Sequence, residues 1–231
     1  LLYIQIISMK KSIIIDFDHT IGCFEQLVFL INVIEKTYHT TLKEEQIHGL
    51  LEKYPLVFRP KLFEILQLIL FYEKSNYITF FILYTCNNRP QFVNCIIHYM
   101  KKKLEIVHSN LFHFVIFETT RVKNGKRLLE TIPKEYHSSH YFCFIDNHCH
   151  KFEPCLNEMK YIKSETYIYD YHLQDILLLF PYSLFEKINK PLLSSYLSYQ
   201  KTRKNKKKLP YPLYEMNSSF ILQSIRDFIS L

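Results

Sequence analysis

The stretch SIIIDFDHTIG, residues 12–22, places three isoleucines directly before two aspartates, Asp16 and Asp18. A short apolar run bounded by polar residues predicts a buried β-strand over 12–16. Two carboxylates one residue apart at the end of such a strand repel each other unless something nearby favours their charge. The fold and function that we expect for the chain depend on which residues or ions lie close to these two carboxylates.

The composition fits one globular domain with a substantial core. The chain has 231 residues, of which 48% are hydrophobic, and this length suffices for one domain with a small insertion. Its three glycines are too far apart for the loop of a P-loop or dinucleotide-binding protein. The cysteines follow no regular framework, which favours reduced thiols. No apolar run reaches the roughly 18 residues of a membrane span. We therefore expect an intracellular, soluble protein that does not contact a membrane.

The positive charge is concentrated in one stretch near the C-terminus. The net charge is +7, and six of the eight residues in KTRKNKKK, residues 201–208, are basic. Such a run is either a solvated linker or a contact for a polyanion, and both interpretations stay open. The residues that would make the polyanion contact are Lys201, Arg203, Lys204, Lys206, Lys207 and Lys208.

Apolar periodicity predicts strands that alternate with helices along most of the chain. Besides the first strand, buried strands are predicted over 77–84, 112–118 and 141–145. Helices are predicted over 24–38, 41–54, 59–74, 87–103, 125–131, 171–188 (interrupted near Pro181) and 218–230. This alternation implies right-handed crossovers and a mainly parallel sheet. The predicted fold class is therefore α/β, with a Rossmann-like sheet flanked by helices.

Polar side chains follow the predicted strands at the point where each strand ends. They are Asp16 and Asp18 after the first strand, Thr85 after the second, Lys123 beyond the third, and Asp146 with Asn147 after the fourth. Parallel sheets bind ligands at this edge, so we expect these side chains to converge. Carboxylate and amide oxygens suit Mg²⁺, whose charge would let crowded carboxylates stay ionised. One carboxylate could then act as a nucleophile on phosphorus, while a hydroxyl and an ammonium group bind the phosphoryl oxygens.

Four motifs, DFDHT, YTCNN, the lysine of RVKNGK and FIDN, resemble in sequence and order those of the haloacid-dehalogenase-like (HAD) phosphotransferases. The stretches FRPKLFEIL, IDN and DYHLQDILLLFPY resemble the branch related to the carboxy-terminal-domain phosphatases, also called NLI-interacting-factor-like. Within that branch the chain looks most like the versions encoded by large DNA viruses, which implies a host cytoplasm or nucleus. The resemblance spans roughly residues 12–189.

The resemblance implies catalytic roles for the residues of the first three motifs. Asp16 would be the nucleophile that forms an aspartyl-phosphate, and it would also bind Mg²⁺. Asp18 would act as general acid and base and give the metal its backbone carbonyl. Thr85 would hold the phosphoryl group, and Lys123 would stabilise the charge of the transition state. Lys126 is the rival for the lysine's role.

Further binding roles and two departures follow from the same resemblance. Asn87 would bind phosphate, while Asp146 and Asn147 would complete the magnesium environment. The branch usually has glutamate where this chain has His19, and small residues where it has Cys86 and Asn87. Its better-known members carry a β-rich insertion after the first strand, whereas residues 23–56 of this chain are predicted to form a helical cap.

The implied organisation has three parts. Residues 1–11 form an N-terminal extension that could lie partly upstream of a true start at Met9. Residues 12–189 form a HAD-like phosphatase domain with the cap at 23–56, and residues 190–231 form a basic tail with a C-terminal helix.

The expected function is a Mg²⁺-dependent phosphatase acting on phosphoserine or phosphothreonine in a protein. The alternatives are a HAD-like scaffold without turnover that binds a phosphorylated or nucleic-acid partner, and a phosphatase of nucleic-acid 3′ ends.

The segment CFIDNHCHKFEPC, residues 143–155, also offers a zinc site as an alternative. Its possible ligands are Cys143, His148, Cys149, His150 and Cys155. These cysteines lack the close pair that structural zinc sites usually show. We therefore expect Cys143 to pack inside the fourth strand.

Overall fold

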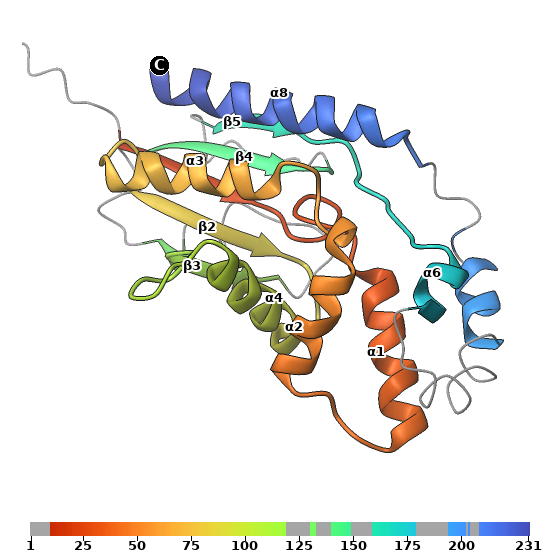
Figure 1. Cartoon of the computed structure of the whole chain (residues 1–231). Helices are drawn as coiled ribbons and strands as arrows, with labels where there is room; N and C mark the ends of the chain where they lie inside the picture. The colour runs from red at the N-terminus through yellow and green to blue at the C-terminus, as the bar shows by residue number, and fades with distance from the viewer. Residues whose placement is uncertain are drawn as a thin grey trace, which may run out of the picture.

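The chain folds around a five-stranded parallel sheet flanked by helices, a Rossmann-like α/β arrangement (Figure 1). The computed structural model describes residues 10–118, 130–132, 140–148, 159–178, 194–201, 203 and 208–231. The strands are β1 (Lys10–Ile15), β2 (Phe80–Thr85), β3 (Phe114–Phe117), β4 (His140–Asp146) and β5 (Met159–Lys163). The helices are α1 (Glu25–Tyr38), α2 (Glu44–Lys53), the 3₁₀ turn η1 (Pro55–Val57), α3 (Leu62–Lys74), α4 (Pro90–Lys103), α6 (Leu173–Leu178) and α8 (Tyr211–Ser230). The predicted α/β fold class is confirmed.

The strand order is β3-β2-β1-β4-β5, and every neighbouring pair is parallel. From β1 the chain moves outward through β2 to β3, and then returns to the other side of β1 for β4 and β5. The order therefore reverses at β1. In open α/β sheets, ligands bind outside the carboxyl ends of the strands at such a reversal, which is where the two opening aspartates lie.

The sheet is covered on both faces by apolar side chains. Alternate residues of a strand point to opposite faces, so Ile13 and Ile15 join a large cluster that includes side chains of α3, α4 and α8. Ile14 joins a smaller cluster on the other face with Ile82 and Phe144. All three isoleucines of β1 are buried. A strand buried on both faces explains why the opening stretch reads as a continuous apolar run.

Helix α8 belongs to the α/β domain rather than to a tail. It begins at Tyr211 instead of at 218, and it lies along α3 and beside β4 and β5 (Figure 1). Its inner face buries Ile221, Ile225 and Phe228 in the large cluster. The described helices include none that is long and apolar enough to cross a membrane.

Strand β5 was not predicted from the sequence. Its residues MKYIK mix lysines with apolar side chains, as is common at the edge of a sheet. Strands β2 and β3 are also shorter at their amino ends than predicted, and β1 begins at Lys10. Most of the helix predicted over 125–131 lies outside the described residues. Of the helix predicted over 171–188, the structure describes only α6, and Pro181 lies outside the described residues.

The segment between β1 and η1 is helical, as the sequence indicated. Helices α1 and α2 occupy it and lie beyond the carboxyl ends of the strands (Figure 1). Helix α2 packs against α4 and η1. Helices α1 and α2 therefore border the edge of the sheet at which the strands end.

Gly22 lies where the chain after β1 crosses the backbone of η1. A Cβ atom at this position would lie 2.5 Å from the carbonyl oxygen of Val57 and 2.6 Å from a ring atom of Phe24. We expect Gly22→Ala to lower the free energy of unfolding by about 1–3 kcal/mol, because the backbone must move. At Gly49, an exposed position within α2, nothing lies within 4 Å. We therefore expect Gly49→Ala to raise that free energy by about 0.5–1 kcal/mol. Denaturant unfolding of both variants measures the two changes in the free energy of unfolding. Changes of the same sign would contradict this prediction.

Candidate active site

The register of the sheet brings the first and fourth motifs together. Ile15 pairs with Ile145, and the backbone N–H of Asp16 donates to the carbonyl oxygen of Ile145 at 3.0 Å. Asp16 and Asp146 therefore come directly after this pair, at the ends of two strands that lie about 4.8 Å apart. Thr85 ends β2 on the other side of β1. The structure thus places these three predicted residues at one edge of the sheet.

Both carboxylates are withdrawn from water. Asp16 is 5% exposed, whereas Asp146 and Thr85 are both 0% exposed. One oxygen of Asp146, Oδ1, accepts a hydrogen bond from the backbone N–H of His148 at 2.7 Å. Two buried carboxylates on adjacent strands carry a desolvation cost that a bound cation would offset. A cation bound at this edge would therefore stabilise both carboxylates.

Asn87 joins the first motif to the second. Its amide nitrogen donates to both carboxylate oxygens of Asp18, each at 3.1 Å. Its backbone N–H donates to Oγ1 of Thr85 at 3.0 Å, and its Oδ1 accepts from the backbone N–H of Arg89 at 2.9 Å. The predicted phosphate-binding residue thus fixes the direction of the Asp18 carboxylate at the start of α4.

Asn147 joins the fourth motif to the first through Thr20. The backbone N–H of Asn147 donates to Oγ1 of Thr20 at 3.1 Å. The Thr20 hydroxyl donates to Oδ1 of Asn147 at 3.1 Å, and the amide nitrogen of Asn147 donates to Thr166 at 3.2 Å. The amide oxygen of Asn147 therefore faces Asp16 and the carbonyl group of Asp18. Thr20 had no predicted role, although it is the threonine of DFDHT. Its place in that motif was the signal that could have identified it.

Arg59 is a second residue of the site that the sequence did not assign. It is 2% exposed, and it donates from Nε to the carbonyl oxygen of Thr20 at 2.6 Å and from Nη2 to that of His19 at 2.9 Å. Burial lowers the pKa of Arg59 to about 10, so the guanidinium is charged at neutral pH. The signal was its place in FRPKLFEIL, next to the proline that precedes α3.

His19 is held on the side of the loop that faces Tyr167. Its Nδ1 lies 2.9 Å from the Tyr167 carbonyl oxygen, and its Nε2 lies 3.6 Å from the Glu25 carboxylate. His19 also contacts Cys23. Burial raises the pKa of the Cys23 thiol, but the hydrogen bond to His19 and the charge of Arg203 outweigh burial, and the pKa is lowered.

The oxygen donors at this edge fit Mg²⁺ in type. The side chains of Asp16 and Asp146, the carbonyl of Asp18 and the amide of Asn147 are all hard donors. The described residues contain no group of three or more His, Cys, Asp and Glu side chains that could hold a metal ion. The predicted set is not such a group, because two of its four donors are a backbone carbonyl and an amide. Lys123 and Lys126 lie outside the described residues.

The part of residues 143–155 that the structure describes does not support a zinc site. Cys143 lies inside β4 and is fully buried, as predicted. Burial raises the pKa of its thiol to about 12, which disfavours the thiolate that zinc requires. Cys149, His150 and Cys155 lie outside the described residues.

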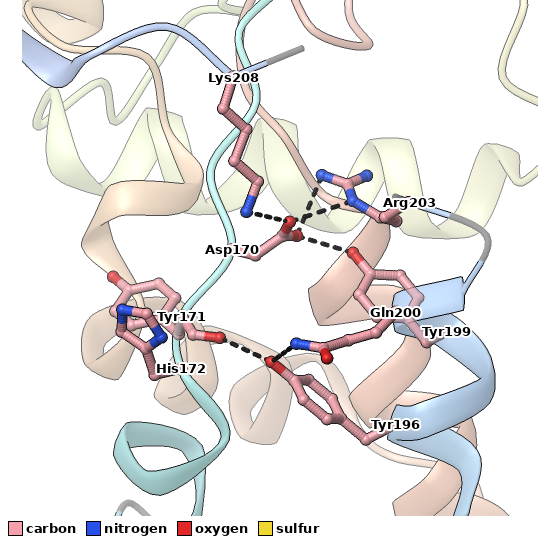
Figure 2. Close-up of a pocket in the computed structure, with 8 residues that line it drawn as sticks. All are labelled: Asp170, Tyr171, His172, Tyr196, Tyr199, Gln200, Arg203 and Lys208. Carbon is pink, nitrogen blue, oxygen red and sulfur yellow. Dashed lines mark hydrogen bonds and ion pairs between the residues drawn. The ribbon is translucent and has the colours of Figure 1, made fainter. Parts of the chain in front are cut away.

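Two members of the basic run are turned toward the protein (Figure 2). The side chain of Arg203 is 6% exposed, donates from Nε to Asp170 at 3.1 Å and contacts Glu25. Lys208 Nζ lies 2.8 Å from the same aspartate. These residues border a pocket of about 480 Å³ between the segment after β5 and the helical residues 194–201. The prediction of a polyanion contact is therefore wrong for Arg203, because its guanidinium is buried against Asp170 and Glu25. Lys204, Lys206 and Lys207 lie outside the described residues, and Lys201 is exposed.

A groove of about 470 Å³ opens beside the second motif, between α1, α2 and the first turn of α4. Its apolar lining includes Val28, Ile31, Leu42, Ile47 and Phe92, and its polar lining includes Glu35, Glu44, Asn88 and Arg89. Asn88 follows Asn87, which contacts Asp18. Because successive Cα atoms are about 3.8 Å apart, the groove starts next to the predicted catalytic edge.

The site rests on contacts among residues that are far apart in the sequence. No protein-family model, curated protein or solved structure matches the chain. Its function is therefore inferred from these residues and their geometry.

Proposed function

We propose that the chain is a Mg²⁺-dependent phosphatase of the HAD type, similar to the carboxy-terminal-domain phosphatases, which forms an aspartyl-phosphate on Asp16. The observation that carries this proposal is that Asp16 and Asp146 lie buried at the ends of adjacent strands, with Thr85 at the same edge. A simple strand-end turn at Asp16 would not require a second buried carboxylate on the neighbouring strand. A phosphoryl group at this edge would meet a nucleophile, a hydroxyl donor and an acid.

The reaction has two steps in this geometry. The Asp16 carboxylate attacks phosphorus, the bond to the leaving oxygen breaks, and Asp18 gives that oxygen a proton. Water then attacks phosphorus, Asp18 takes its proton, and the bond between Asp16 and phosphorus breaks to release phosphate. Asn87 keeps the Asp18 carboxylate in place through its two hydrogen bonds. Thr85 Oγ1 accepts from the Asn87 N–H, which leaves the Thr85 hydroxyl hydrogen to donate to a phosphoryl oxygen.

Bound Mg²⁺ would supply the positive charge that lets two buried carboxylates stay ionised beside a phosphoryl group. Asp16, the carbonyl of Asp18, Asp146 and Asn147 would hold it. In this proposal Lys123 stabilises the charge on the transferring group, with Lys126 as the alternative.

The groove beside Asn88 favours a phosphorylated protein as the substrate. The apolar side chains of its lining suit those that flank a phosphoserine or phosphothreonine. Glu35 and Glu44 place two carboxylates in its lining beside one positive charge, that of Arg89, and this excess of negative charge would repel the backbone of a nucleic acid. The alternative of a nucleic-acid 3′-end phosphatase is therefore weaker. A scaffold without turnover is also weaker, because binding alone gives no reason to bury two adjacent carboxylates.

A substrate comparison tests this proposal. With Mg²⁺ present, we expect the purified protein to hydrolyse a generic aryl phosphate, and we expect EDTA to suppress this activity until Mg²⁺ is restored. Between a phosphoserine peptide and a 3′-phosphorylated oligonucleotide, we expect kcat/KM to favour the peptide by at least about tenfold. The measurement is phosphate release. Preference for the oligonucleotide would support the 3′-end alternative, and tight binding without release would support the scaffold.

A further inference from the structure

The loop that carries Asp18, here called the aspartate loop (residues 18–22), has a conformation that needs support. His19 has φ 62°, a left-handed backbone conformation that costs a non-glycine residue about 1 kcal/mol or more. It lies between Asp18, which contacts Asn87, and Thr20, which contacts Asn147. The contacts that hold His19 therefore also set the direction of both neighbours.

One residue holds three successive carbonyl groups of the aspartate loop. The guanidinium of Arg59 donates to the carbonyl oxygens of His19 at 2.9 Å and Thr20 at 2.6 Å. The backbone N–H of Arg59 donates to the carbonyl oxygen of Ile21 at 2.9 Å. Because the guanidinium is planar and rigid, its orientation is transmitted to the loop.

Helix α8 sets the orientation of that guanidinium. Asn217 accepts two hydrogen bonds at Oδ1, from Arg59 Nη1 at 2.9 Å and from the backbone N–H of Glu165 at 3.0 Å. Arg59 Nη2 also donates to the carbonyl oxygen of Glu165, and the Tyr167 ring lies 5.6 Å from the guanidinium carbon. The side-chain amide of Asn217 thus holds the guanidinium of Arg59 together with the carbonyl group of Glu165, which is itself hydrogen-bonded to Asn217 through its backbone N–H.

We propose that Asn217 and Arg59 are positioning residues through which α8 holds the aspartate loop in its active geometry. Asn217 is partly exposed and adds no apolar volume to the core, so its effect on the loop can be separated from the packing of the helix. The conformational part of this inference stands on the hydrogen bonds alone, whereas its catalytic part rests on the proposed phosphatase function.

A matched pair of substitutions at Asn217 tests the inference in the full-length protein. Asn217→Asp keeps an oxygen for both hydrogen bonds, whereas Asn217→Leu is of similar size and has no acceptor. Ser219→Ala is the control on the same helix, because it removes two exposed hydrogen bonds, from Lys61 and to the carbonyl oxygen of Glu215, and neither involves the aspartate loop. The first readout is hydrogen–deuterium exchange in residues 17–24, where the backbone N–H of His19 donates to Gly22 and that of Ile21 donates to Phe17. The second is kcat and KM for the aryl phosphate with Mg²⁺.

We expect Asn217→Leu to speed exchange in residues 17–24 by at least about tenfold, because the loop opens more often. We expect its kcat to fall by about tenfold with KM within about twofold. Asn217→Asp and Ser219→Ala should resemble the wild type in both readouts. Exchange in the strands of the sheet should stay unchanged in all three variants.

The outcomes separate this inference from the proposed function. Wild-type exchange in Asn217→Leu, or equal effects of the leucine and aspartate substitutions, would overturn the inference. Faster exchange with unchanged kcat would overturn its catalytic part. A wild type that releases no phosphate would overturn the proposed function, while the exchange data would still decide whether α8 holds the loop.

Discussion

Asp16→Asn is expected to lower kcat for an aryl phosphate at least about a thousandfold, because an amide oxygen is too weak a nucleophile to form the aspartyl-phosphate. The loss should arise in the chemical step. Acid quenching during turnover of a radiolabelled substrate should therefore trap phosphate on the wild-type protein and none on the variant. Substitution of Asp175, an exposed residue of α6, provides the matched control, and Asp175→Asn should keep wild-type activity.

The same variant should be at least as stable as the wild type when no metal is added. Asp16 lies beside Asp146, and both are buried, so removal of one negative charge relieves repulsion in a low-dielectric region. Thermal unfolding in EDTA measures this effect. An inactive variant with a lower Tm would indicate a folding defect, and an active variant would rule out Asp16 as the nucleophile.

Phe228→Ala is expected to lower the free energy of unfolding by about 3–5 kcal/mol, because it leaves a cavity in the core. Phe228 is 0% exposed, and its ring lies 5.1 Å from that of Tyr141 on β4. Each kcal/mol should lower Tm by about 2–4 °C for a chain of this size. Calorimetry or circular dichroism measures the shift.

The control is the same substitution on the outer face of the same helix. Phe220 is 56% exposed, so Phe220→Ala should change the free energy of unfolding by no more than about 0.5 kcal/mol. Helix propensity cannot distinguish the two variants, because both replace phenylalanine by alanine within α8. Equal losses would show that the inner face of α8 does not pack on the sheet.

The predictable part of the fold was the part whose apolar pattern is local. Strand β1 is a continuous apolar run, and helices α1 and α4 carry their own periodicity; the predicted and observed bounds of all three nearly agree. Strand β5 has no such pattern, because its five residues gain their structure by pairing with β4. The start of α8 was missed because Tyr214 is buried only once the helix docks. Tertiary contacts decided both cases.

The candidate site likewise has a part that the sequence predicted and a part that depends on tertiary contacts. Parallel topology alone predicted that Asp16, Thr85 and Asp146 would lie at one edge. The motifs DFDHT and FRPKLFEIL marked the positions of Thr20 and Arg59, but not their hydrogen-bond partners, because these depend on a loop whose shape the sequence does not show. Arg203 was predicted as a surface charge because its partners, Asp170 and Glu25, are distant in the sequence.

The hydrogen bond from Lys11 Nζ to the carbonyl oxygen of Ile229, at 2.7 Å, has a kinetic consequence. It joins the start of β1 to the last turn of α8 across 218 positions of sequence, and contacts of such long range are slow to form because loop closure costs entropy first. We expect α8 to dock late in folding, after the central strands have paired. Because Asn217 belongs to α8, folding intermediates would then have an ordered sheet but an unsupported aspartate loop, and catalytic competence would emerge only with the slowest phase.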